Sequence, residues 1–351
     1  MLFKNEEVLS PEYLPEILPH REGQIKELVR NIEVLAKGRK AENVFIYGPP
    51  GIGKTACVKF VFRQFKEYAG VHSVYINTWD YNTTSSLLAK IVLSLNYPIP
   101  RRGLSKDEIL EKLIEVLKKL RKGLIVCLDE VDRLIVRDQN VLYDLVRINQ
   151  YVDLPVCVIM ISNFRDVLAK LEPRIASSLG LKEIEFKPYT LNEMKDILGE
   201  RCLLAFKEPV EEGVVLLCAN HAINRGGDVR VGLECLRKAS RVAEEQGSER
   251  LKVEHVKAIL KDVRAVKMEI VKENLKGVEK NIVEILNDGK TYTSTQLWEE
   301  YKRRFGEISQ TALSEYVKRL KEFGLVKTRE DRRESRGRKI YIRLLKRKRF
   351  K

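Results

Sequence analysis

The sequence predicts three successive structural units: an α/β unit with a parallel sheet (residues 1–189), an all-helical unit (190–267) and a winged helix-turn-helix unit (268–351). The first prediction depends on short apolar runs that alternate with helical patterns, which is typical of parallel sheets. The second depends on purely helical periodicity after Tyr189. The third depends on three helical patterns followed by two short strand patterns in a basic C-terminus.

A glycine-rich segment, Gly48–Thr55, defines the candidate site of the first unit. It fits the phosphate-binding loop G-x-x-x-x-G-K-[ST], and an apolar run at 43–47 precedes it while a helical pattern follows it. Lys54 can reach the β- and γ-phosphates of a nucleotide, and the Thr55 hydroxyl can bind Mg²⁺. The sequence therefore predicts ATP or ADP and Mg²⁺ as cofactors. The expected nucleotide contacts of the loop are Pro50, Gly51, Ile52, Gly53, Lys54, Thr55 and Ala56.

Two acids, Asp129 and Glu130, follow a buried strand pattern. Asp129 is expected to be a partner of Mg²⁺, and Glu130 the general base that activates the attacking water. The next apolar strand pattern, 156–162, is followed by Asn163. Because the carboxyl ends of parallel strands meet at one edge of the sheet, both acids, Asn163 and Lys54 should converge there. The sequence therefore predicts an ATPase.

The positive charge of the chain is concentrated at its C-terminus. The net charge is +15, and residues 323–351 hold 13 Lys/Arg against 3 Asp/Glu. Such a segment is suited to a polyanion, and the patterns around it are those of a winged helix. They are helices at 278–286, 295–305 and 309–323 and strands at 325–329 and 339–344.

In a winged helix, the third helix can enter the major groove of DNA while the loop between the strands contacts a neighbouring groove or the backbone. The expected core side of the third helix is Ala312, Leu313, Tyr316, Val317 and Leu320. The expected DNA-facing side is Ser309, Gln310, Thr311, Ser314, Lys318 and Arg319. The basic loop, here called the wing, holds Arg332, Arg333, Arg336, Gly337 and Arg338. A winged helix that binds protein is the alternative interpretation.

Taken together, these motifs resemble an AAA+ ATPase, and more narrowly the archaeal replication initiators related to origin recognition complex subunit one and cell division control protein six. The resemblance covers nearly the whole chain. Gly48–Thr55 and Leu128–Glu130 look like the Walker A and B motifs, Ile161–Asn163 is similar to sensor one and Gly227–Arg230 to sensor two.

Several residue roles follow only from this resemblance. It implies that His20 and Arg21 lie against the adenine, that Asn163 helps to position the water or the γ-phosphate, and that Arg230 contacts the phosphates from the helical unit. Arg174 is the candidate arginine finger for a neighbouring subunit, with a local structural salt bridge as the alternative.

An insertion between the second and third strands is similar to a DNA-contacting element of the same initiators. The resemblance therefore makes Arg101 and Arg102 candidate phosphate contacts.

The resemblance implies a replication initiator that binds double-stranded origin DNA in an ATP- or ADP-dependent manner and hydrolyses ATP slowly. Its implied partners are the replicative (minichromosome maintenance) helicase and paralogous initiator subunits. Three alternatives are a clamp-loader-type ATPase, a winged-helix transcriptional regulator, and a protein that keeps ATP as a permanent structural cofactor.

The remaining composition bears on the compartment. The acidic N-terminus lacks the features of a secretory signal, and no uninterrupted apolar run is long enough to cross a bilayer. We expect a cytoplasmic, nucleoid-associated protein without a membrane partner. The six cysteines form no C-x-x-C pair and are expected to be reduced core residues.

Overall fold

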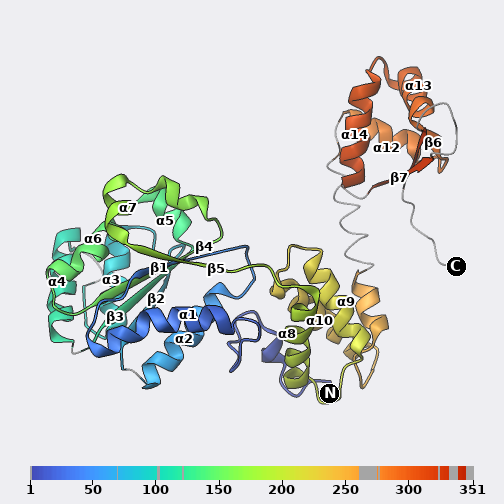
Figure 1. Ribbon diagram of the computed structural model, residues 1–351. Coiled ribbons are helices and arrows are strands. Elements are labelled where there is room, and N and C mark those ends of the chain that lie inside the picture. Colours follow the sequence, from blue (N-terminus) through green and yellow to red (C-terminus); the bar gives the residue numbers. More distant parts are fainter. Residues whose placement is uncertain are drawn as a thin grey trace. The chain divides into compact units, whose positions relative to one another are not determined.

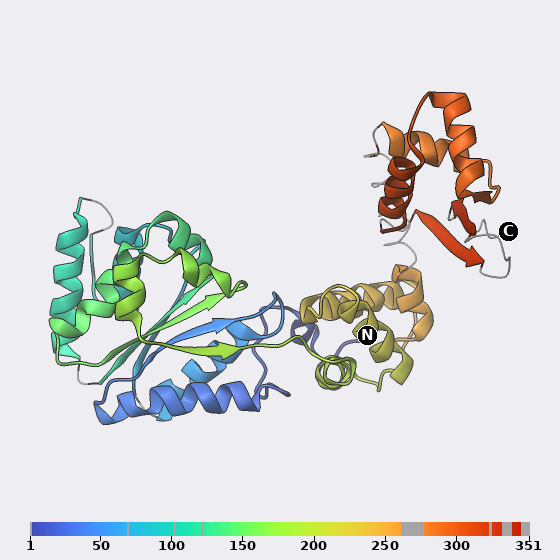
Figure 2. The ribbon, with the colours of Figure 1, turned by 45° about the horizontal axis from the view of Figure 1, so that its top comes forward.

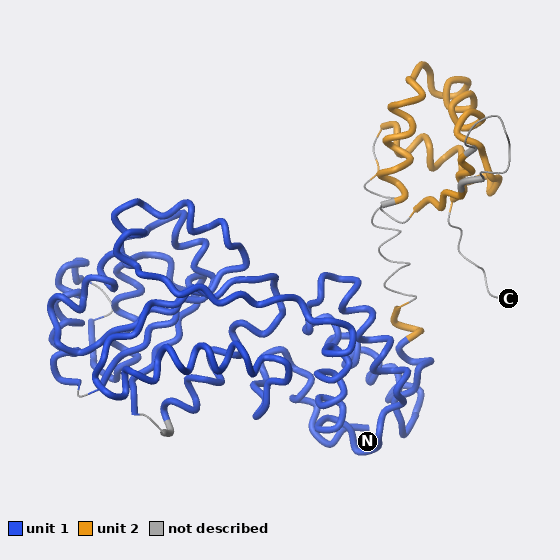
Figure 3. Tube along the Cα trace, in the orientation of Figure 1, with its two compact units in different colours: residues 1–256 blue, residues 257–351 orange. Residues whose placement is uncertain are grey.

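The computed structural model describes residues 2–68, 70–100, 103–120, 122–260, 275, 277–322, 325–331 and 339–344. The chain divides into two compact units, Met1–Val256 and Lys257–Lys351 (Figure 3). Each unit is described by itself below.

The first unit contains a five-stranded parallel sheet in the order β2-β3-β4-β1-β5 (Figure 1). Strands β3 and β4 are buried along their whole length, as expected for strands that have helices on both faces. The predicted strands are confirmed, and β5 lies at the edge of the sheet. The strands are β1 (Asn43–Tyr47), β2 (His72–Asn77), β3 (Leu124–Asp129), β4 (Val156–Ser162) and β5 (Leu181–Glu185).

Helices cover both faces of this sheet (Figures 1 and 2). One face carries α1 (Glu22–Ile32) and α2 (Lys54–Tyr68). The other carries α3 (Thr84–Ser94), α4 (Lys106–Lys119), α5 (Val131–Arg137), α6 (Asn140–Arg147) and α7 (Pro173–Leu179). The sequence pair Ser105 and Glu108 forms a capping box at the start of α4: the Ser105 hydroxyl accepts from the Glu108 N–H, and the Glu108 carboxylate accepts from the Ser105 N–H.

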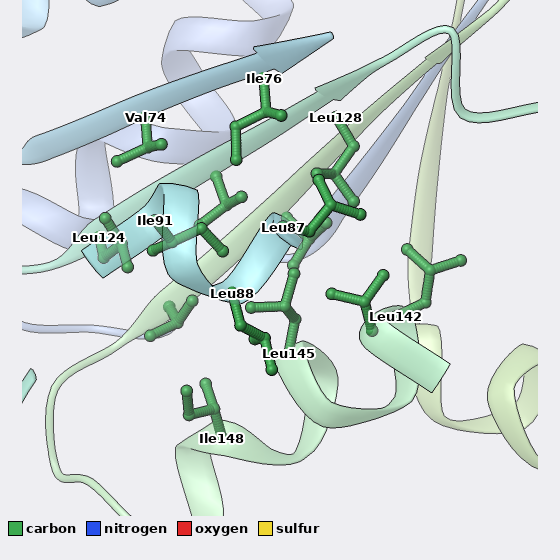
Figure 4. Close-up of a cluster of buried hydrophobic side chains, with 14 of the residues drawn as sticks. Val74, Ile76, Leu87, Leu88, Ile91, Leu124, Leu128, Leu142, Leu145 and Ile148 are labelled. Carbon is green, nitrogen blue, oxygen red and sulfur yellow. The ribbon is translucent and has the colours of Figure 1, made fainter. Parts of the chain in front are cut away.

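The main hydrophobic core lies between the sheet and α3 (Figure 4). Leu87, Leu88 and Ile91 of α3 pack against residues of β2 and β3, with Leu142 and Leu145 of α6 closing the cluster. The apolar spacing of α3 thus anchors the segment that follows β2. This packing makes the carboxyl edge of the sheet a rigid platform.

A helical region follows β5 within the same unit. It consists of α8 (Leu191–Ala205), α9 (Glu212–Ile223), α10 (Val229–Glu245) and further helix at 253–260. A capping box of Thr190 and Glu193 marks its start. The beginning of the chain packs on this region: Phe3 pairs with Phe206, and η1 (Glu6–Leu9) lies against α8 and α10.

The second unit has a hydrophobic core of its own. Its helices are α12 (Val278–Leu286), α13 (Ser294–Phe305) and α14 (Gln310–Glu322). Its antiparallel sheet has the order β6-β8-β7, with β6 (Tyr292–Thr293), β7 (Val326–Asp331) and β8 (Lys339–Leu344). Three helices and a small antiparallel sheet are consistent with the predicted winged helix.

Two details of this unit differ from the prediction. Strand β6 was not predicted, because two residues carry no alternation pattern and the strand is defined by the pairing of Tyr292 with Ile342 and of Thr293 with Tyr341. Strand β7 continues to Asp331, so Glu330 is part of the strand rather than of the loop.

Two whole-chain expectations concern the cysteines and the membrane. All six cysteines lie within the described residues, and each is buried and unbridged, as predicted. Within the described ranges, none of the helices combines the length and apolarity needed to span a bilayer.

Candidate functional site

A cavity of about 650 Å³ lies in the first unit at the carboxyl edge of the sheet. Its walls come from the proline-punctuated segment at residues 11–19, the phosphate loop, the ends of β2, β3 and β4, and helices α8 and α10. Six of the seven predicted loop contacts line it: Pro50, Gly51, Gly53, Lys54, Thr55 and Ala56. Ile52 is fully buried behind them.

The phosphate loop has the conformation that its glycines permit. Gly48 and Gly51 have φ angles of 146° and 71°, and a Cβ on Gly48 would lie 2.1 Å from the Phe186 carbonyl oxygen. Helix α2 begins at Lys54, directly after the loop. The positive end of the helix dipole therefore faces the cavity, which favours an anion there.

Lys54 is buried at 6% exposure and joins the loop to β4. Its Nζ donates to the Gly48 and Pro49 carbonyls, both at 2.7 Å, and to Asn163 Oδ1 at 2.9 Å. Burial lowers the pKa of Lys54 to about 8, although the nearby Asp129 opposes the shift. The geometry thus brings Lys54 and Asn163 together at one edge, as expected from the carboxyl ends of parallel strands.

The Asp129 carboxylate accepts hydrogen bonds from three donors. Its Oδ2 accepts hydrogen bonds from the Thr55 hydroxyl at 2.6 Å and the Tyr75 hydroxyl at 2.7 Å, and its Oδ1 accepts from the Glu130 N–H at 2.9 Å. Burial and the neighbouring Asp129 raise the pKa of Tyr75. Sequence reasoning missed Tyr75, because the contact depends on the pairing of β2 with β3.

The oxygen atoms of Thr55 and Asp129 fit a magnesium ion. Hard divalent cations prefer carboxylate and hydroxyl oxygens, and both residues line the cavity beside Lys54. The Thr55 hydroxyl donates its hydrogen to Asp129 and therefore keeps its lone pairs for a cation.

Glu130 lies at the mouth of the site in a strained conformation. Its φ of 57° is uncommon for a residue with a side chain, and the Thr78 hydroxyl donates to its carbonyl at 2.7 Å. Burial, together with Asp129 and Asp132, raises the pKa of the Glu130 carboxyl. A carboxyl with a raised pKa beside the phosphate loop is suited to proton transfer.

Arg21 supports the phosphate loop from behind instead of lining the cavity. The side chain is 5% exposed, and its Nε and Nη2 donate to the Ile52 carbonyl at 3.1 and 3.0 Å. Its Nη2 also donates to the Lys187 carbonyl at 3.0 Å, and its guanidinium lies 3.7 Å from the Tyr189 ring centroid.

His20 likewise points away from the cavity, with its Nε2 3.0 Å from Asp196 Oδ2. The two preceding residues, Leu18 and Pro19, line the cavity, whereas His20 and Arg21 do not. The adenine contact that the resemblance implies for His20 and Arg21 stays a prediction.

The helical region reaches the phosphate loop through the start of α10. The Val229 N–H donates to the Gly51 carbonyl at 3.0 Å, and a Cβ on Gly51 would lie 1.8 Å from Asp228 Oδ1. Asp228 also forms an ion pair with Arg230, with Nη2 2.7 Å from Oδ2, and this contact raises the pKa of Arg230. Arg230 is half-exposed and lines the cavity.

Arg174 is paired within its own segment. Its Nε lies 2.7 Å from Glu172 Oε2, both side chains are about half-exposed, and its guanidinium lies 5.1 Å from the Tyr143 ring centroid. The local salt bridge named as the alternative is thus present.

The second unit presents the predicted polar face on α14. Leu313, Val317 and Leu320 are buried in the core as predicted, whereas Ala312 and Tyr316 are only half-buried. The exposed face is Ser309, Gln310, Thr311, Ser314 and Lys318. Arg319 forms an ion pair with Glu279 of α12, at 3.7 Å.

Seven predicted DNA contacts lie outside the described residues. They are Arg101 and Arg102 of the insertion and Arg332, Arg333, Arg336, Gly337 and Arg338 of the wing.

The site combines a phosphate loop, two acids at the end of β3, a polar residue after β4 and an arginine of the helical region that lines the same cavity. These features define a nucleotide-binding protein of the AAA+ class. Family comparisons agree: a model described as an AAA domain matches residues 37–168, and one described as the Cdc6 AAA+ ATPase-type lid domain matches residues 195–259.

Relatives along nearly the whole chain define the family more narrowly. The chain is 35% identical over 343 residues to the ORC1-type DNA replication protein 1 of Sulfurisphaera tokodaii, covering 93% of this chain and 86% of the relative. It is 33% identical to the protein of the same description from Archaeoglobus fulgidus, covering 93% and 83%.

Solved structures agree with these relatives. The Aeropyrum pernix ORC1 protein in complex with DNA matches with a TM-score of 0.68 and 32% identity, covering 98% of this chain and 94% of that one. Cdc6p from Pyrobaculum aerophilum matches with a TM-score of 0.68 and 26% identity, covering 97% and 94%. The chain belongs to the archaeal ORC1/Cdc6 family of AAA+ DNA replication initiators.

Proposed function

We propose that this chain is an ATP-dependent initiator that binds duplex origin DNA and helps to recruit or load the replicative helicase. The nucleotide part rests on two hydrogen-bonded pairs at one edge of the sheet, Lys54 with Asn163 and Thr55 with Asp129. The DNA part is supported by the exposed polar face of α14 and by the relative from Aeropyrum pernix, which was solved in complex with DNA.

In the proposed nucleotide site, Lys54 binds the β- and γ-phosphates, and Thr55 and Asp129 hold Mg²⁺. Bound Mg²⁺ would neutralise charge on the phosphates. Glu130 accepts a proton from the attacking water, and Asn163 orients that water or the γ-phosphate. Hydrolysis on this scheme is slow, and the site acts as a switch.

The switch is proposed to work through α10. Arg230 is shared between Asp228 and the phosphates of a bound nucleotide, while Asp228 lies against Gly51 of the loop. A γ-phosphate that attracts Arg230 would weaken its pairing with Asp228 and shift the helical region relative to the sheet. The ATP- and ADP-bound forms would then differ in their ability to assemble on DNA.

The proposed DNA contacts are the exposed face of α14, the wing (residues 332, 333 and 336–338) and the pair Arg101 and Arg102. Lysine and arginine side chains bind phosphates at any sequence, whereas the polar residues of α14 can read base edges. We place the domain boundaries after residues 189 and 267. The lid match at 195–259 and the division into compact units after Val256 lie close to these boundaries.

The assembly partners are proposed from the family resemblance: the minichromosome maintenance helicase and paralogous initiator subunits at the nucleoid. Arg174 remains a proposed finger in trans, although it would have to leave Glu172 to act on a neighbouring nucleotide.

Binding of the full chain to three labelled duplexes tests this function: a genomic origin fragment, a promoter fragment and a composition-matched control. Heparin serves as the competing polyanion. We expect origin DNA to be preferred, with an affinity that differs between ATP and ADP, and Lys54→Ala to lose the nucleotide effect while it keeps DNA binding. A preference for promoters would favour the regulator. Uptake of ATP without any preference for duplex over heparin would overturn the initiator assignment.

A further inference from the structure

Tyr75 occupies a position beside the magnesium ligands that the mechanism above does not use. It lies in β2, paired in register with Cys127 of β3, and its hydroxyl donates to Asp129 Oδ2 at 2.7 Å. Lys59 of α2 covers the other side, with its Nζ 4.4 Å from the ring centroid. The phenol is thus enclosed between a helix and the acid that ends the neighbouring strand.

The three donors on Asp129 come from three different segments. Thr55 begins α2, Tyr75 belongs to β2, and the Glu130 N–H follows β3. Hydrogen bonds therefore hold both carboxylate oxygens in place, and Oδ2 accepts two of them. Because the Thr55 hydroxyl has a single hydrogen, the direction of Asp129 also decides where the lone pairs of Thr55 point.

We propose that Tyr75 is a positioning residue for Mg²⁺: its hydroxyl holds Asp129 so that Thr55 and Asp129 present their oxygens to the cation together. The inference rests on the proposed nucleotide function. Without the phenol, Asp129 Oδ2 keeps only the hydrogen bond from Thr55. The carboxylate can then rotate, and the hydroxyl of Thr55 turns with it. Groups that orient metal ligands in this way commonly contribute about 10- to 100-fold to metal affinity.

The test must separate the hydroxyl from the ring, because the ring also packs against Lys59. Tyr75→Phe removes the hydroxyl and keeps the ring. Tyr47→Phe is the matched control: Tyr47 ends β1 of the same sheet, and its hydroxyl has no hydrogen bond to the residues that the structure describes. Tyr75→Leu also lacks the hydroxyl. It replaces Tyr75→Phe in the test if Tyr75→Phe does not fold.

The measurement is the affinity of the full chain for a fluorescent ATP analogue, titrated with Mg²⁺ and, separately, in EDTA. We expect Tyr75→Phe to raise the half-saturating Mg²⁺ concentration about tenfold. Its affinity in EDTA should stay within about twofold of wild type, and Tyr47→Phe should match wild type in both conditions. Equal Mg²⁺ dependence in Tyr75→Phe and wild type would overturn the inference.

A second arm tests whether Tyr75 acts through Asp129. In an Asp129→Ala background, the further change Tyr75→Phe should alter the Mg²⁺ dependence by less than about twofold, because the group it positions is gone. A full tenfold effect in that background would also overturn the inference. A wild-type chain whose ATP affinity does not respond to Mg²⁺ would instead overturn the proposed function, and this outcome is distinct from the other two.

Discussion

The two candidate sites of this chain are built in opposite ways. In the first unit the central side chains of the site are hydrogen-bonded to neighbours, and Lys54 and Asp129 are only 6% and 4% exposed. In the second unit the candidate DNA contacts that the structure describes lie on the exposed face of one helix, α14, whose buried face packs into the core.

This difference sets what a substitution can do. In the nucleotide site, removing one group disturbs its partner, because Lys54 is hydrogen-bonded to Asn163 and Thr55 to Asp129. On α14, each exposed side chain acts nearly independently, so effects should be smaller and additive. The predictions below test that contrast, beginning with the largest effect.

Glu130→Gln should lower the rate of ATP hydrolysis by about 10²- to 10⁴-fold, because a general base is lost. ATP binding should remain within about twofold, since the amide keeps the shape of the carboxylate. Phosphate release in single turnover measures the rate, and Glu185→Gln, at the exposed end of β5, is the control. An unchanged rate would contradict the general base and favour a permanently bound structural nucleotide.

Removing the four wing arginines should produce the next largest effect. Changing Arg332, Arg333, Arg336 and Arg338 to alanine should flatten the dependence of DNA affinity on salt, by up to about 0.9 in the log–log slope for each DNA phosphate that is no longer neutralised. Titrations from low to high salt measure the slope. Changing Lys37, Arg39, Lys40 and Lys118 to alanine removes the same charge from exposed positions of the first unit. If both variants keep the wild-type slope, the wing does not provide the main contacts with the DNA phosphates.

Lys318→Ala should weaken DNA binding about three- to tenfold and reduce the salt slope by about 1, as expected for one phosphate contact. Lys280→Ala makes the same charge change on the exposed surface of α12 and should have little effect. Equal effects of the two variants would show that Lys318 contributes only to the net positive charge. Its position on α14 would then not matter for DNA binding.

The smallest effect concerns pH. The pKa of Lys54 is about 8 in the free chain because burial disfavours its charge, whereas phosphates favour the charged form. Binding therefore takes up a proton above that pKa, so ATP affinity should fall about three- to fourfold between pH 7 and pH 8.5. Fluorescence titrations across that range measure the decline. Glu130→Gln should show the same decline, and a flat or rising affinity would contradict the shifted pKa.

Much of the fold could be predicted because its signals are local. The apolar runs at 43–47 and 156–162 are β1 and β4, and the Ser105–Glu108 and Thr190–Glu193 pairs are the capping boxes of α4 and α8. The parallel direction of the strands also made the convergence of Lys54 and Asn163 predictable, because parallel strands bring their carboxyl ends to one edge.

Sequence patterns were enough to predict most of the helices and strands and the chemical character of the candidate sites: the phosphate loop, the two acids at the end of β3 and the polar face of α14. Periodicity and residue type within a few positions carry that information. Only the tertiary structure decided that Tyr75 bonds Asp129, that Arg21 supports the loop and that Asp228 lies against Gly51. Those contacts join residues far apart in the chain, and their partners follow from packing and register, which no local pattern records.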